Sequence, residues 1–148
     1  MKQLTVAACL GLASLSLACG PTAAADLAAN KELVRAFFEA VESRDSAKVE
    51  KIVREDYIQH VPTIPTGRKA ILNYIDMVKA QGKGKMPTIA RMIAEGDLVA
   101  VHFRRDNPTG PVAAIEIFRI QDGLIAEHWA VTEPFPPASA IRNDNGML

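Results

Sequence analysis

The spacing of apolar residues changes from a helical period to a strand period near Pro87. Before Pro87, apolar side chains recur every three or four positions in three segments, which is typical of amphipathic helices. Asn30, Asp45 and Thr66 can cap the starts of these segments, and Gly82 can end the third. The apolar stripes are Leu33, Val34, Phe37, Phe38 and Val41, then Val49, Ile52 and Val53, then Ile71, Leu72, Ile75 and Val78.

After Pro87, apolar and polar residues alternate, as in strands that bury one face. Residues 88–105 are predicted to form two strands joined at Glu95-Gly96-Asp97. Residues 111–131 are predicted to form two more, joined around Asp122-Gly123. Three helices followed by four strands predict an α+β fold, with the helices covering one face of an antiparallel sheet. The short piece "DYIQHVP" before the third helix is expected to be extended, and the tail at 135–148 to be loose.

The turn of the last hairpin decides which side chains share a face. A three-residue loop of Gln121, Asp122 and Gly123 would place Glu116 opposite His128. A two-residue loop would place Glu116 opposite Trp129 and send His128 to the other face. Glycine in the third position favours the three-residue loop, so we expect Glu116 and His128 on one face.

Residues 1–25 have the composition of an export signal, with an apolar run at 4–17 and the small-residue site Ala23-Ala24-Ala25 before Asp26. The run is too short to span a bilayer. The alternative is a lipoprotein signal that ends before Cys19, which would then carry a lipid anchor. The first reading predicts a periplasmic or secreted protein, and the second a membrane-anchored lipoprotein.

Removal of residues 1–25 leaves 123 residues (148 − 25), enough for one domain, which we place at 26–134. This part carries 16 Lys/Arg and 17 Asp/Glu, because only Lys2 is removed. A net charge near −1 gives no reason to expect nucleic-acid binding. Cys9 and Cys19 both precede the cleavage site, so burial rather than disulfides must stabilise the domain.

Glu116 is the one charged residue in the apolar run "VAAIEIF". Burying an unpartnered polar group costs roughly 2–7 kcal/mol, so this carboxyl group must be partnered or hold its proton. A buried carboxyl group of this kind suits general acid–base chemistry near neutral pH. The alternative is a structural ion pair with Arg119 or another arginine at the sheet surface.

The three histidines suggest an imidazole partner for this acid rather than a metal site. His102 ends the strand "LVAVH" and matters for catalysis only if it shares the face of Glu116. His60 lies near a proline turn, and His128 adjoins Trp129. Their spacing does not match that of metal ligands, so no metal is expected. The chain also lacks the nucleophile elbow of serine hydrolases and the glycine pattern of dinucleotide-binding proteins.

The segments "YIQHVP", "IAEGDLVAVHF" and "IEIFRIQDGLIAEHW", together with the three preceding helices, resemble the SnoaL-like polyketide cyclase family of the NTF2-like superfamily. The resemblance covers roughly residues 30 to 134. It implies a cone-shaped α+β barrel of three helices and a curved sheet around a pocket. It also implies frequent dimers and cofactor-free acid–base catalysis of aldol-type ring closure.

Carried over to this sequence, the family's strand acid falls on Glu116 and its partnering histidine on His102. The acid of the family's "EHWD" pattern is replaced by Ala130. We therefore expect Glu116 and His102 to transfer a proton next to a carbonyl group of a small, mostly apolar compound. The alternative is a binding protein that holds a small hydrophobic ligand without turning it over. Ligand contacts are expected from Tyr57, His60, Phe118, His128 and Trp129.

A homodimer is also expected, because apolar strand residues on the outside of the sheet would need cover. The residues assigned to this outer face are Val99, Val101 and Ile117.

Overall fold

The computed structural model describes residues 22–148, and the side chains from Asp26 onward. Residues 1–21, which carry most of the predicted export signal and both cysteines, lie outside the described residues. The predictions of export, of the lipid anchor at Cys19 and of the cleavage site at Ala25 therefore stay predictions. Among the described helices, none is long and apolar enough to cross a membrane.

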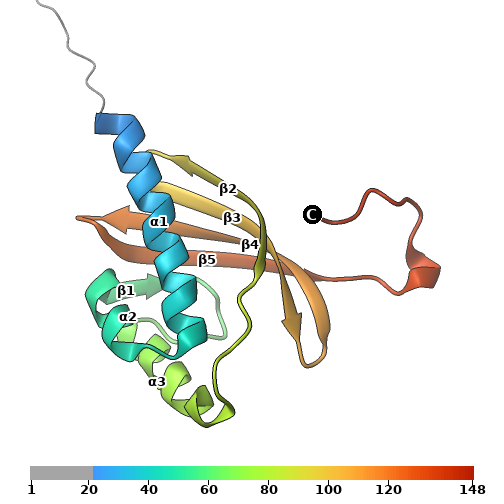
Figure 1. Cartoon of the computed structure of the whole chain (residues 1–148), viewed down its shortest axis with the longest axis horizontal. Coiled ribbons are helices and arrows are strands. Elements are labelled where there is room, and N and C mark those ends of the chain that lie inside the picture. The colour runs from blue at the N-terminus through green and yellow to red at the C-terminus, as the bar shows by residue number, and fades with distance from the viewer. Residues whose placement is uncertain (1–21) are drawn as a thin grey trace, which may run out of the picture.

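The chain forms a helical part followed by an extended sheet (Figure 1). The helices are α1 (Thr22–Ser43), α2 (Ser46–Ile52) and α3 (Arg68–Val78), with short 3-10 helices η1 (Lys79–Gln81) and η2 (Ala138–Ala140). The strands are β1 (Val53–Gln59), β2 (Thr88–Glu95), β3 (Leu98–Asn107), β4 (Gly110–Gln121) and β5 (Leu124–Pro134).

The sheet has the order β1-β5-β4-β3-β2, and α1 lies across one of its faces (Figure 1). The predicted α+β class, with helices on one face, is confirmed. Two details differ from the prediction. The extended piece before α3 is a fifth strand, β1, which pairs in parallel with β5, so the sheet is mixed. The edge strands β1 and β2 do not pair with each other, so the sheet is open and not a closed barrel.

Two of the three predicted helix caps are wrong. The first helix runs through Asn30, because the alanine-rich residues before it favour helix strongly. At α3 the N-cap is Gly67, and the Thr66 hydroxyl instead donates to the backbone oxygen of Tyr57 at 3.0 Å. Asp45 does cap α2, since its side chain accepts a hydrogen bond from the Lys48 backbone N–H at 2.9 Å.

The hairpin between β4 and β5 has a two-residue turn, not the three-residue loop that we expected. Asp122 and Gly123 have φ of 53° and 73°, the positive values that a type I′ turn requires. Glu116 therefore lies opposite Ala130, and Phe118 lies opposite His128. The register shifts by one residue between Arg119 and Ile120, which is a β-bulge in β5. This extra residue returns His128 to the face of Glu116, so the predicted face is right although the pairing is wrong.

The core lies between α1 and the inner face of the sheet. The inner face of β3 carries Val99, Val101 and Phe103, all at most 1% exposed. Two of the three residues that we assigned to an uncovered outer face are thus buried beneath the helices. Ile117, which pairs with Trp129 and Ala100, does lie on the outer face. The homodimer stays a prediction.

Candidate functional site

A cavity of about 310 Å³ opens between α1, α3, β1 and the inner face of the sheet. Its wall is mostly apolar, with phenylalanine side chains from α1 and aliphatic side chains from α1, α3 and the loop before α3. The side chains that bring polar ends to this wall are Tyr57, Gln59, Tyr74, Arg105, Glu116 and His128. A cavity of this size and composition is suited to a small organic ligand.

Glu116 and His128 meet at the floor of this cavity. They lie on adjacent strands, β4 and β5, and are 9% and 8% exposed. His128 Nε2 is 3.2 Å from Glu116 Oε2, within ion-pair distance, although the two groups are not aligned as a hydrogen bond. The two groups are therefore in contact at a site that is largely closed to water.

Gln59 fixes which nitrogen of His128 carries a proton. The side-chain oxygen of Gln59 accepts a hydrogen bond from the Val61 backbone N–H at 3.0 Å, which identifies this atom as the amide oxygen. The same oxygen lies 3.1 Å from His128 Nδ1, so Nδ1 must be the protonated donor. In neutral His128 the unprotonated nitrogen is then Nε2, the atom that faces Glu116.

This contact joins a carboxyl group to an imidazole nitrogen. A protonated Nε2 can face the Glu116 carboxylate at 3.2 Å favourably, and an unprotonated Nε2 can do so only if the carboxyl group carries the proton. Contact between a potential acid and a potential base is the arrangement that general acid–base catalysis needs.

Tyr57 adds a neutral hydroxyl group close to this pair. Burial raises the pKa of the Tyr57 hydroxyl, and the negative charge of Glu116 raises it further. The hydroxyl accepts a hydrogen bond from Gln59 Nε2 at 3.2 Å. Within residues 26–148 its own proton is donated to no other side chain, so it is available to a ligand.

The predicted pair of Glu116 with His102 is wrong in its geometry. On β3 the residue opposite Glu116 is Val101, while His102 lies opposite Ile115 on the outer face. There His102 Nδ1 accepts a hydrogen bond from Arg91 Nη1 at 2.8 Å. Because neighbouring residues on a strand point to opposite faces, His102 cannot reach Glu116.

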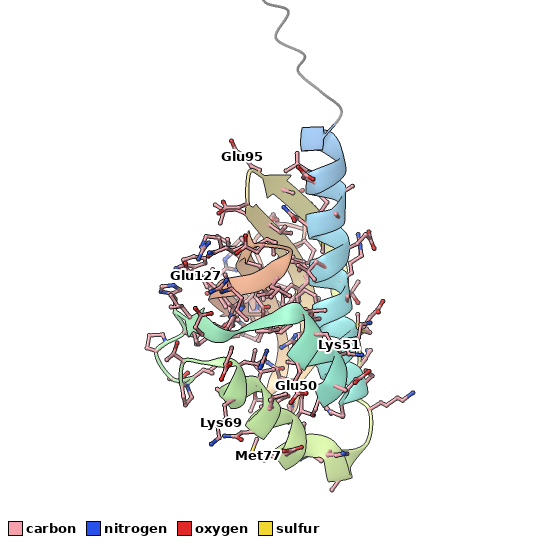
Figure 2. All side chains as sticks on the ribbon, turned by 90° about the vertical axis from the view of Figure 1, so that its left-hand side faces the viewer. Glu50, Lys51, Lys69, Met77, Glu95 and Glu127 are labelled. Atoms are coloured by element: carbon pink, nitrogen blue, oxygen red, sulfur yellow. The ribbon has the colours of Figure 1, made fainter. Side chains whose placement is uncertain are left out.

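His60 and Trp129, which we expected among the ligand contacts, also lie outside the cavity. Their rings stack at 4.3 Å between centroids with 5° between planes. His60 Nε2 donates to Glu127 Oε2 at 2.9 Å, and Figure 2 shows Glu127 on the side away from α1. The bonds from His60 and then from Arg119 lower the pKa of Glu127.

Arg119 belongs to this outer cluster, which excludes it as the structural partner of Glu116. Its Nη2 lies 2.6 Å from Glu127 Oε1.

The other predicted ligand contacts divide between the cavity wall and the packing beneath it. Tyr57 and His128 line the cavity. Phe118 is fully buried, and its ring lies 4.8 Å from the ring of His128. Phe118 therefore supports His128 from below and does not line the cavity.

Two polar residues of the cavity were not among the predicted site residues. Gln59 has a clear signal in retrospect, because it follows Tyr57 at the two-residue spacing of one strand face. Arg105 follows Val99, Val101 and Phe103 at the same spacing. Among residues 22–148, no three His, Cys, Asp or Glu side chains are placed to hold a metal ion.

Comparison with known proteins gives one family match and several structural matches. The family model of the SnoaL-like domain matches residues 34–128. No curated protein matches the chain. A candidate ketosteroid isomerase from Kribbella flavida matches with a TM-score of 0.64 at 20% identity, over 83% of this chain and 95% of that protein.

Two further solved structures match a somewhat smaller share of the chain. An NTF2-like protein of unknown function from Cytophaga hutchinsonii has a TM-score of 0.60 at 18% identity, over 71% of this chain and 90% of that one. Wild-type IdmH, a candidate polyketide cyclase from Streptomyces antibioticus, has a TM-score of 0.55 at 21% identity, over 70% and 91%. At these identities the likeness concerns the fold, and it confirms the predicted NTF2-like architecture.

Proposed function

The chain belongs to the SnoaL-like family, and we propose that it catalyses proton transfer at a carbon next to a carbonyl group, without a cofactor. The substrate class that we propose is a small, mostly apolar carbonyl compound. Two structural neighbours carry names from this class of chemistry, a candidate ketosteroid isomerase and a candidate polyketide cyclase. Because a fold can host many functions, the proposal depends on the site and not on this likeness.

One observation carries the proposal, the buried contact of 3.2 Å between His128 Nε2 and Glu116 Oε2 at the floor of an apolar cavity. A carboxylate and an imidazole in contact can pass a proton to a substrate and take it back with little rearrangement. Because the pair is little exposed to solvent, the electrostatic interaction between Glu116 and His128 is stronger than it would be in water. A purely structural role would leave an acid at a cavity wall where an apolar residue would pack at lower cost.

In the ionised form of the pair, Glu116 accepts the proton from the carbon next to the carbonyl. The electrons of the broken C–H bond move into the enolate, whose oxygen becomes negative. The neutral Tyr57 hydroxyl and the protonated Nε2 of His128 are the donors that stabilise this oxygen. Return of the proton to a different carbon gives an isomer, while attack of the enolate carbon on a second carbonyl closes a ring.

Exchange of carbon-bound hydrogen in heavy water tests the proposal without knowledge of the natural substrate. We expect the protein to accelerate deuterium uptake by β-tetralone, followed by proton NMR. His128→Gln should lower the protein-dependent rate by roughly a hundredfold or more, because it removes one member of the acid–base pair. His60→Gln, which alters the outer-face histidine, should leave the rate unchanged.

Two results would contradict the proposal. One is an equal loss of rate in the His60 and His128 variants, which would point to a general effect on folding. The other is tight binding of β-tetralone with no protein-dependent exchange, which would favour the hydrophobic-ligand binding protein instead.

A further inference from the structure

Arg105 places a positive charge in the same cavity as the acid–base pair. It lies on the inner face of β3, four residues along the strand from Val101, which is opposite Glu116. At a rise of about 3.4 Å per residue, this puts Arg105 roughly 14 Å along the sheet from Glu116. Both side chains nevertheless line one cavity. The cavity therefore has a catalytic end and a cationic end.

The charge of Arg105 is only weakly compensated by the protein. Its nearest carboxylate is that of Glu42, with 3.8 Å between Arg105 Nη2 and Glu42 Oε1, too long for a hydrogen bond. Arg44 approaches the same carboxylate at 3.9 Å, so two arginines share one acid. The cluster of Glu42, Arg44 and Arg105 carries a net positive charge beside the cavity.

The Nε–H group of Arg105 is buried and has no hydrogen-bond acceptor within the described part of the chain. A buried donor without an acceptor leaves the guanidinium only partly satisfied by the protein. The guanidinium also lies 5.3 Å from the centre of the Phe103 ring, a contact that orients its plane. The guanidinium plane therefore has a fixed orientation, and the accessible part of the side chain brings its positive charge to the cavity wall.

We infer that Arg105 binds a carboxylate group of the substrate, so that this protein prefers keto acids to neutral ketones. The inference rests on the proposed function and narrows its substrate class. The carboxylate lies against the accessible part of the Arg105 guanidinium, and the reacting carbonyl lies against Glu116 and His128. The apolar wall between these two ends contacts the hydrocarbon part. A carboxylate suits a guanidinium because its two oxygens match the fork of N–H donors.

A matched pair of ligands separates charge recognition from general binding. We would measure by calorimetry the affinity of wild-type protein for γ-benzoylbutyrate and for its methyl ester. These two compounds share the ketone and the aromatic ring, and they differ in the negative charge. Wild-type protein should bind the acid about tenfold or more tightly than the ester, as expected for a charge-assisted bidentate contact.

Arg105→Leu should abolish this preference while changing the affinity for the ester by less than about twofold. Arg105→Lys keeps the charge and should retain part of the preference; it also serves as the test variant if the leucine variant does not fold. The control is Arg104→Leu on the outer face, where the Arg104 side chain donates to Asp106 at 2.9 Å. This control should bind both ligands as the wild type does.

Equal affinity of wild-type protein for acid and ester would overturn the inference. So would an equal loss of both affinities in Arg105→Leu, which would make Arg105 a structural link to Glu42. Deuterium exchange at the carbon next to the ketone is measured on the same samples. It tests the catalytic proposal separately from the carboxylate site. A preference for the acid without exchange would refute the catalytic proposal and support the carboxylate site. Exchange without a preference would do the reverse.

Discussion

Glu116→Gln should lower the rate of protein-dependent deuterium exchange by roughly 10²–10⁴ while ligand binding stays nearly unchanged. The reason is that glutamine keeps the size and polarity of the side chain but cannot accept and return a proton. Exchange is measured by NMR with β-tetralone, and binding is measured by calorimetry on the same protein. A loss of rate with intact binding would locate the defect in proton transfer.

The matched control for this variant is Glu127→Gln. Glu127 is the acid of the outer-face cluster with His60 and Arg119, on the other side of the sheet from the cavity. The Glu127→Gln variant should catalyse deuterium exchange of β-tetralone at the wild-type rate. If Glu116→Gln keeps the wild-type rate, Glu116 is not the base, and the ion pair with His128 is structural.

Phe118→Ala should lower the free energy of unfolding by about 3–5 kcal/mol, the range for deleting a buried aromatic side chain. Phe118 is fully buried, and its ring lies 5.4 Å from that of Phe37 and 5.8 Å from that of Phe38. The substitution leaves a cavity in the centre of the core and removes the support beneath His128. Guanidinium unfolding followed by the fluorescence of Trp129 measures the loss.

Two variants define the limits of this effect. Phe118→Leu keeps an apolar side chain and should lose clearly less stability than Phe118→Ala. Ile93→Ala, at a position that is 65% exposed, should change stability by no more than about 0.5 kcal/mol. A loss below about 1 kcal/mol for Phe118→Ala would show that the core repacks around the missing ring, so that the aromatic contacts of Phe118 contribute little to stability.

The sequence was a good guide to the layers of the fold and a poorer guide to its register. Helical and alternating patterns follow from which face is buried, so α1, α2, α3 and the strands β2 to β5 were predicted from them. The turn at Asp122-Gly123 allowed two loop lengths, and the glycine preference that we used favoured the wrong one. The bulge near Ala126 has no residue type that marks it, so only the paired strands reveal it.

The site was predicted in part for the same reason. A lone acid in an apolar strand is visible in the sequence, and Glu116 was found in this way. Its partner was assigned to His102 from the family resemblance, but which face a histidine occupies depends on the pairing of β3 with β4. Arg105 was missed because arginine at the end of a strand usually reaches solvent, and only the cavity shows that this one turns inward.

The central claim is that Glu116 and His128 act as one proton-transfer unit, and a double-variant experiment tests it most directly. Deuterium exchange of β-tetralone is measured for Glu116→Gln, for His128→Gln and for the protein with both substitutions. If the two residues act together, the double variant should be no slower than the slower single variant, because either loss already disables the unit. If the two losses instead multiply, Glu116 and His128 act independently, and the claim of a single proton-transfer unit is wrong.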